Sequence, residues 1–377
     1  MWREEDETQQ MLRESAESFA RSRHSLERFR TNRSLAAGFD KAMWHEMAEL
    51  GWTGILLPEA MGGAGLDLGP ALALAEIFGA HLIPEPFIAS SVIAGTILGA
   101  SQSTRAAELA GALVDGSATV ALAYQEDLST VFPSTATTKV ERSGDGLVLS
   151  GRKLFVPGWC DDSVLLVTAL LENSPVIVAI SAEDAGVSAV PQKMADGGLA
   201  TDVALDRVAV ELTSILLTGV EAETTANLAV ARGIVALCAQ LEGLARQLLG
   251  LTSEYLGQRV QFDKPLAHFQ ALRHGIANLH TSIELSGASW RSAAKALDSG
   301  LTAATKLQLC AAKARCSQTA LDVGKSAIQY HGGFGYTEEA SVGLYVNAGL
   351  RWASWMGSPH MHRELSLSYH LSPGATL

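Results

Sequence analysis

Two short segments carry side chains that could hold a negatively charged nucleotide. The first reads Arg259-Val-Gln261-Phe262, followed by Phe269-Gln270, and the second reads Gln329-Tyr-His-Gly332-Gly333. Arginine presents paired donors in a fixed plane that suits a pyrophosphate, and glycines let backbone N–H groups approach an anion closely. The glutamines can donate or accept. Each motif alone is also typical of a surface arginine or a helix end, so the prediction depends on their joint occurrence.

Helical periodicity surrounds both segments. Apolar residues recur at three- and four-residue spacing from Glu4 to about Ser117, and this spacing returns from about Ser214 onward. It predicts three long helices over Asn227–Gly257, Pro265–Leu297 and Ala303–Tyr330. These helices are apolar on more than one face, which is typical of helices packed inside a bundle and against other subunits.

Between about Ala118 and Leu212 the pattern changes to short β-branched stretches separated by turns such as Ser143-Gly-Asp-Gly146. Strands are predicted over Thr119–Ala123, Thr135–Val140, Leu147–Leu149, Val164–Ala169, Val176–Ile180 and Val203–Val210. The order of elements indicates an α+β chain with an N-terminal helical domain over 1–117, a middle β domain over 118–213 and a C-terminal helical domain over 214–377.

Composition narrows the function classes. The chain has 377 residues, 47% of them hydrophobic, which allows two or three domains with a large core. Its net charge of −12 argues against nucleic acid or an anionic membrane as the main partner. The four cysteines have no metal-ligand spacing and are expected to be reduced thiols. With no signal-peptide pattern and no run of about 18 uncharged apolar residues, we expect a soluble cytoplasmic protein.

The C-terminal motifs resemble the signature end of the acyl-CoA dehydrogenase family. They are Gln329-Tyr-His-Gly332-Gly333-Phe-Gly335-Tyr336, Arg351-Trp-Ala-Ser-Trp-Met356-Gly357-Ser358 and Arg363, and an earlier Gly51-Trp52 turn followed by Pro58-Glu59 and Gly62-Gly63 is similar to a turn of the same family. The resemblance extends over nearly the whole chain. It implies an acyl-CoA dehydrogenase-like fold that ends in a four-helix bundle.

In that family one FAD is shared across a dimer interface. The resemblance implies that this chain keeps the contacts made to the other subunit's flavin, which would be Arg259, Gln261, Phe262, Gln270, Gln329, Gly332 and Gly333. The contacts to a flavin of its own are altered, because Tyr124-Gln125-Glu126 and Lys153-Leu-Phe155-Val-Pro157 stand where the family has a threonine-glutamate pair and a tryptophan-x-threonine. Proline has no backbone donor and no hydroxyl replaces the threonine.

The catalytic glutamate that these enzymes use as a base is also replaced. Counting from Gly332-Gly333 without a gap, its position is Met356, and the alternative position, counted back from Arg259 through Gly243, is Gly233. Removing an α-proton needs a base, and neither residue offers one. We therefore predict no catalytic residue at either place and no metal.

The resemblance implies the subunit without a base in bacterial α2β2 acyl-CoA dehydrogenases. A second acyl-CoA dehydrogenase-type subunit would carry the glutamate, the substrate would be an acyl-CoA thioester with a sterol side chain or another bulky group, and an electron-transferring flavoprotein would take the electrons. The Leu82-Ile-Pro84-Glu-Pro86-Phe segment is similar to those bacterial members. Two alternatives are a homo-oligomeric flavin monooxygenase of the same family and a catalytically silent scaffold that binds CoA thioesters.

Further polar side chains have simpler interpretations. His360 and His362 could take up protons, but we favour the view that they fill a disused pocket. Arg232 could reach a CoA phosphate or pair with an acid. Glu242 and Glu254 share a helix, and Glu254 is close enough to Arg259 for a contact on the helix surface.

Overall fold

The computed structural model describes residues 6–133, 136–144, 146–337 and 339–371. The chain divides into two compact units whose segments alternate along the sequence. Unit 1 comprises Met1–Arg30, Leu72–Ile83 and Ile234–Leu377, and unit 2 comprises Thr31–Ala71 and Pro84–Gly233. The boundaries of three consecutive domains, 1–117, 118–213 and 214–377, stay a prediction.

The N-terminal part is helical, as predicted. Aspartate or serine caps open three of its helices: Asp6, Asp40 and Ser103 each accept from a backbone N–H two or three residues further on. The helices are α1 (Glu7–Arg23), α2 (Leu26–Asn32), α3 (Lys41–Glu49), η1 (Glu59–Met61), α4 (Leu68–His81), the π-helix η2 (Ile88–Ala94), α5 (Gly95–Ala100) and α6 (Thr104–Val114).

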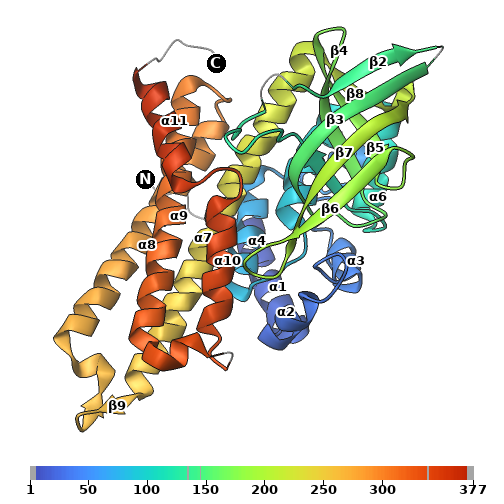
Figure 1. The fold of residues 1–377 in the computed structure, drawn as a ribbon. Coiled ribbons are helices and arrows are strands. Elements are labelled where there is room, and N and C mark those ends of the chain that lie inside the picture. The colour runs from blue at the N-terminus through green and yellow to red at the C-terminus, as the bar shows by residue number, and fades with distance from the viewer. Residues whose placement is uncertain (1–5, 134–135, 145, 338, 372–377) are drawn as a thin grey trace. The chain divides into compact units, whose positions relative to one another are not determined.

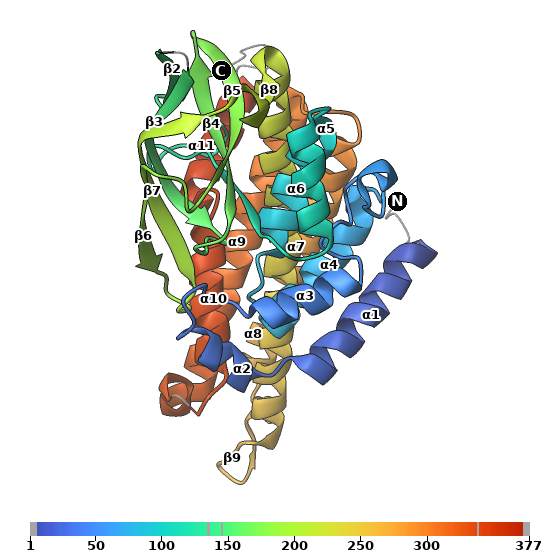
Figure 2. The same cartoon turned by 90° about the vertical axis from the view of Figure 1, so that its right-hand side faces the viewer.

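The middle of the chain forms an eight-stranded sheet in unit 2, most of whose strands are labelled in Figure 2. The strand order is β6-β7-β3-β2-β4-β5-β8, and β1 pairs with β4. Pairing is antiparallel except where β4 meets β1 and β2. The strands are β1 (Val120–Ala123), β2 (Lys139–Ser143), β3 (Gly146–Pro157), β4 (Val164–Leu171), β5 (Ser174–Ser181), β6 (Val187–Lys193), β7 (Leu199–Val210) and β8 (Ile215–Thr218), with η3 (Leu212–Ser214) before the last.

Two strands of this sheet were not predicted from the sequence. β6 is an edge strand whose residues are mostly exposed and include Pro191, so it lacks the apolar alternation that marks a half-buried strand. β8 is only four residues long. The predicted strands carry the sheet core, in which Leu149, Leu165 and Val203 are fully buried. One end of the Thr135–Val140 prediction lies outside the described residues, and the strand there begins at Lys139.

An ion pair between buried Lys153 and partly buried Glu126 links β3 to the loop after β1. Lys153 is fully buried, and its Nζ donates to Glu126 at 2.6 Å and to the carbonyl and hydroxyl of Thr168 on β4. The Glu126 carboxylate also accepts from the backbone and hydroxyl groups of Thr137 and Thr138. Burial alone would raise the pKa of Glu126, but hydrogen bonds from Lys153 and the threonines outweigh it and lower the pKa to about 2.

The C-terminal part is helical, and the α+β fold class is confirmed. α7 begins eight residues before the predicted start at Asn227, because Gly219 has a φ of +60° and turns the chain directly from β8 into the helix. The elements are α7 (Gly219–Gln258), β9 (Val260–Gln261), β10 (Lys264–Pro265), η4 (Leu266–His268), α8 (Gln270–Leu297), α9 (Ala303–His331), η5 (Gly332–Tyr336), α10 (Val342–Ser354) and α11 (Pro359–Leu371). Figure 1 shows α8 and α9 side by side.

Within unit 1, α4 and α7 cross with their backbones in contact. A Cβ at Gly79 would lie 1.9 Å from the carbonyl oxygen of Gln240, and one at Gly243 would lie 1.9 Å from that of Glu76. The crossing buries Glu242, which accepts from Trp290 at 2.6 Å. Arginines compensate the two carboxylates: Arg246 and Arg291 donate to Glu242, and Arg13 and Arg291 to Glu76.

α7 is long and apolar enough to cross a membrane if length and composition alone are considered. However, 89% of its most apolar window is buried within the protein. This burial is typical of the core helix of a soluble protein.

Glu126→Gln should destabilise the protein at pH 7 by about 3 kcal/mol, because Lys153 would lose the carboxylate that compensates its burial. The folded-state pKa of Glu126 lies below its ordinary value, so this stabilisation is present above pH 4.5 and is lost as the pH falls towards about 2. Urea unfolding of wild type and variant over this acid range should therefore show a shrinking difference. Glu141→Gln, at an exposed position on β2, is the control. A difference that stays constant with pH would contradict this assignment.

Candidate functional site

The β9–β10 hairpin presents an aromatic residue at its tip. Phe262 and Asp263 form the turn, with φ of +55° and +62°. Positive φ at both central residues is the type I′ arrangement, which asparagine and glycine usually occupy. Phe262 is 82% exposed, and its ring meets the edge of Phe269 at a centroid distance of 6.1 Å. A large apolar side chain so placed contributes little to the core of its own chain and is suited to a contact with another molecule.

Arg259 lies between α7 and the hairpin. Its N–H donates to the carbonyl of Tyr255 at 2.9 Å, and its own carbonyl accepts from Leu266 at 2.9 Å. The backbone of Arg259 is therefore fixed while its side chain is exposed. Gln261 on β9 and Gln270, the first residue of α8, are exposed as well.

The turn after α9 leaves its backbone open. Gly332 has a φ of +60° and a ψ of −142°, a conformation that glycine adopts readily and other residues do not. A Cβ at Gly332 or Gly333 would meet no atom within 4 Å. Gln329, in the last turn of α9, is exposed. A ligand can approach the main chain closely at such a turn.

Aromatic stacking brings the hairpin and the glycine turn together. Tyr255, one turn before Arg259, stacks on His331 with ring centroids 4.2 Å apart. Its hydroxyl donates to the His331 carbonyl at 3.3 Å. Figure 1 shows this end of unit 1 at the β9 label. Seven predicted residues thus lie at one end of the helices of unit 1: Arg259, Gln261, Phe262, Gln270, Gln329, Gly332 and Gly333.

In unit 2, the loop after β1 is bonded to itself. The Tyr124 hydroxyl donates to the carbonyl of Val131 at 3.0 Å, and the Gln125 side chain donates to that of Thr130 at 2.8 Å. The Gln125 carbonyl accepts from Leu154 on β3. The side-chain amide of Gln125 therefore donates within its own loop.

The facing part of β3 is irregular. Phe155 has a φ of +51° in a register shift between Lys153 and Val156, and its N–H donates to Asp202 at 3.2 Å. Pro157 ends the strand and has no N–H. In the part of unit 2 that the resemblance assigns to the chain's own flavin, Pro157 therefore has no N–H to offer. The Gln125 side chain and the Phe155 N–H already donate within the chain.

Met356 is buried in a rigid turn of unit 1. It is 1% exposed with a φ of +54°, and its carbonyl accepts from Nε2 of His362 at 2.8 Å. Lys313 supports the same turn: its Nζ donates to the carbonyls of Trp352, Ala353 and Gly357 at 3.0–3.4 Å and to a serine hydroxyl. Burial lowers the pKa of Lys313 to about 8. A thioether in this turn has no proton to exchange.

Sequence reasoning missed Lys313. The available signal was a lone lysine in the apolar run Cys310-Ala-Ala-Lys313-Ala, on a helix predicted to be buried. The other base position, Gly233, is a buried residue of α7. Its neighbour Arg232 donates to the hydroxyl of Thr96 at 3.3 Å.

The remaining polar candidates do not form a site together. His360 is exposed and lies 3.2 Å from Glu364, whereas His362 is fully buried and burial lowers its pKa to about 3. The buried His362 thus agrees with the expected pocket-filling role, whereas for the exposed His360 that expectation is wrong. Glu254 accepts from Gln258.

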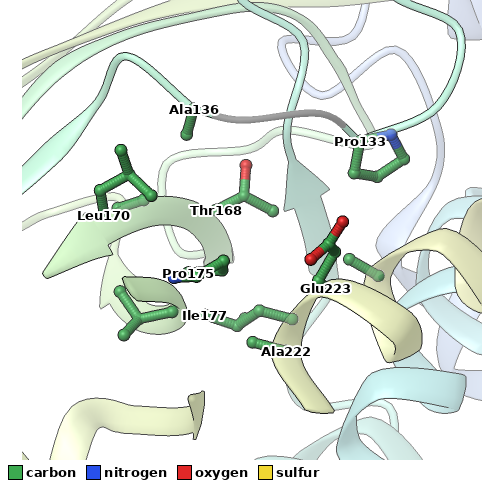
Figure 3. A pocket seen from close by; sticks show the side chains of 11 residues that line it. Pro133, Ala136, Thr168, Leu170, Pro175, Ile177, Ala222 and Glu223 are labelled. Atoms are coloured by element: carbon green, nitrogen blue, oxygen red, sulfur yellow. The ribbon is translucent and has the colours of Figure 1, made fainter. Parts of the chain in front are cut away.

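Unit 2 also contains a small hollow between the sheet and the start of α7. Figure 3 shows the Glu223 carboxylate beside Thr168, with apolar walls from Pro133, Pro175 and Ile177. None of the predicted site residues lines it. One carboxylate and one hydroxyl among apolar walls give no basis for assigning chemistry there.

Comparison with known proteins places these features in a family. Residues 6–116 match the N-terminal domain of acyl-CoA dehydrogenases and residues 219–367 match the C-terminal domain. The 3-(aryl)acrylate reductase of Clostridium sporogenes is 26% identical over 89% of this chain and 91% of that protein.

Two solved structures are similar over almost the whole chain. A variant of the Tcur3481-Tcur3483 steroid acyl-CoA dehydrogenase is 27% identical with a TM-score of 0.87, and the match covers 98% of this chain and 99% of that one. The ChsE4-ChsE5 complex of Mycobacterium tuberculosis has the same fold, with a TM-score of 0.87 at 20% identity over 99% of each chain. Carrying both terminal domains on this fold, the chain belongs to the acyl-CoA dehydrogenase family.

Proposed function

We propose that this chain is the subunit without a base in a heteromeric FAD-dependent acyl-CoA dehydrogenase. It completes, from one end of unit 1, an FAD site whose other wall belongs to an unlike partner. The partner carries the catalytic glutamate, and the assembly is α2β2. The complex removes two hydrogens from the α and β carbons of an acyl-CoA thioester.

The observation that carries this proposal is the contrast between the two halves of the family's flavin site. The half that would face another subunit is exposed and open, with Arg259, Phe262 and the Gly332 turn available to a ligand. The half that would hold a flavin of the chain's own is closed by Gln125 and interrupted at Pro157. In a homo-oligomer, every flavin site would therefore combine the open half of one subunit with the closed half of another, and no site would be complete.

FAD fits the open half. Arg259 supplies an exposed guanidinium for the pyrophosphate, and the backbone at Gly332 and Gly333 leaves room for a nucleotide. Gln270 and Gln329 can donate or accept at its edge. When bound, FAD supplies the acceptor for the β-hydride. This chain contributes binding and orientation, because Met356 and Gly233 cannot take the α-proton.

The substrate class rests on similarity. The steroid acyl-CoA dehydrogenase pair named above supports a bulky acyl group such as a sterol side chain. Family resemblance supports an electron-transferring flavoprotein as the electron acceptor.

Isolation of the native complex through an affinity tag on this chain tests the assembly. Native mass spectrometry should show equal numbers of two unlike chains and one FAD for each pair, and this chain expressed alone should be colourless or poorly soluble. A homo-oligomer with stoichiometric FAD would contradict the proposal and favour a monooxygenase-type enzyme. A homo-oligomer without flavin that binds acyl-CoA would favour a scaffold.

Arg259→Ala should weaken FAD retention in the complex by about 1.5–3 kcal/mol, the scale of a charge-assisted hydrogen bond. Flavin release on dilution, followed by fluorescence, measures the change. Arg315→Ala is the control, since Arg315 is an exposed arginine of α9 about 21 Å along the helix from Gln329. Unchanged retention in an intact complex would leave Arg259 a structural residue only.

Met356→Leu should leave dehydrogenation by the complex nearly unchanged, because it conserves volume in a buried turn that does no chemistry. Removing the partner's glutamate should lower the rate by about 10²–10⁴-fold. Met356→Glu should create no second active pocket, since Gln125, Phe155 and Pro157 still fail to seat a flavin. Turnover per flavin on an acyl-CoA series with an artificial acceptor decides the matter. A large loss for Met356→Leu, or doubled flavin for Met356→Glu, would show a working site in this chain.

A further inference from the structure

We infer that Tyr255, Gly275, Tyr330 and His331 form a brace that sets the positions of the three arms of the flavin half-site. The arms are the Arg259 hairpin, the start of α8 at Gln270 and the Gln329–Gly333 turn. The inference rests on the proposed function and adds to it, because none of the four brace residues is among the seven expected to contact FAD. They act as positioning residues.

The first strut joins α7 to α9. Tyr255 stacks on His331 at 4.2 Å with an angle of 21° between the rings, and Phe334 lies beside both, with its centroid 6.0 Å from Tyr255 and 6.5 Å from His331. His331 is buried, and its Nδ1 lies 2.8 Å from the carbonyl of Ala327. Since a carbonyl can only accept, Nδ1 carries the proton and donates, which fixes the ring plane. The imidazole is thus a rigid platform for Tyr255.

This strut reaches Arg259 through the backbone. The Tyr255 carbonyl accepts from the N–H of Arg259, and the Tyr255 hydroxyl donates to the carbonyl of His331, next to Gly332. The side chain of Tyr255 therefore contacts His331, the residue before the glycine turn, while the main chain of Tyr255 bonds to Arg259. Displacing Tyr255 would move the two anion-facing arms relative to each other.

The second strut joins α9 to α8. A Cβ at Gly275 would lie 2.0 Å from the hydroxyl oxygen of Tyr330 and 3.1 Å from its Cζ atom. The tyrosine hydroxyl thus occupies the space where any other residue at 275 would carry a side chain. Gly275 lies five residues after Gln270 on the same helix. At the end of α9, Tyr330 therefore packs against α8, and its neighbour His331 packs against α7.

A half-site at an exposed end of the helices depends on such bracing. The hairpin has two strands of two residues each, and the glycine turn has open space around it. Without a brace, these arms would have to be ordered when the cofactor binds, which reduces affinity. Displacements of about 1 Å are enough to weaken a positioned site.

Replacement of Gly275 by alanine tests the second strut, and replacement of Tyr255 tests the first. In the complex isolated through this chain, Gly275→Ala and Tyr255→Leu should each speed FAD release by about tenfold. Tyr255→Phe keeps the stack and should have a smaller effect. Gly275→Ala combined with Tyr330→Phe removes the clashing oxygen and should restore much of the retention. Gly250→Ala is the matched control, since a Cβ at that position of α7 meets nothing within 4 Å.

Hydrogen exchange separates a local brace from a general loss of stability. In Gly275→Ala and Tyr255→Leu, exchange should rise in 259–262 and 329–333 and stay unchanged in the middle of α7 and α9. A uniform rise, or unchanged FAD release in a flavin-loaded complex, would overturn the brace alone. A wild-type complex that contains no flavin would instead overturn the proposed function on which the brace depends.

Discussion

The contact between the backbones of α4 and α7 constrains the rest of unit 1. Gly79 and Gly243 leave no space for a side chain between the two helices. The adjacent residues Glu76 and Glu242 are buried at this crossing. Two neighbouring buried carboxylates are tolerable only with cations close by. Arg291 contacts both carboxylates, so α8 is held in register with the crossing.

This register determines where the candidate site lies. α7 continues without interruption from Gly243 to Gln258, so the position of Tyr255 and of the hairpin that follows is set by the crossing about four turns earlier. Lys313 does the same for the C-terminal turn by binding the carbonyls that end α10. The candidate half-site and the turn at Met356 are thus both held by buried charge, one compensated by arginines and the other by main-chain carbonyls.

Much of this could be predicted from the sequence, and the failures have physical causes. The ends of the long helices were located to within one residue except at two starts: α8 begins five residues after the predicted Pro265, and a glycine turn at Gly219 starts α7 early. The flavin-binding role of the seven half-site residues stays a prediction; they were named from the sequence because arginine, glutamine and glycine have distinctive chemistry. Tyr255 and Tyr330 were not, since an aromatic residue at helical spacing resembles ordinary core. The Gln125 loop was unpredictable as well, because its bonds depend on where Thr130 folds back.

The closed loop at Gln125 has an evolutionary consequence under the proposed division of labour. Once this loop no longer binds a cofactor, cofactor binding no longer selects against substitutions in it. New hydrogen bonds, such as that from Tyr124 to Val131, then contribute to the stability of the fold. Restoring the ancestral wall would then require several changes together, each unfavourable alone. The specialisation of such a subunit is therefore hard to reverse. The two chains come to depend on each other through accumulated neutral substitutions rather than through any gain in catalytic rate.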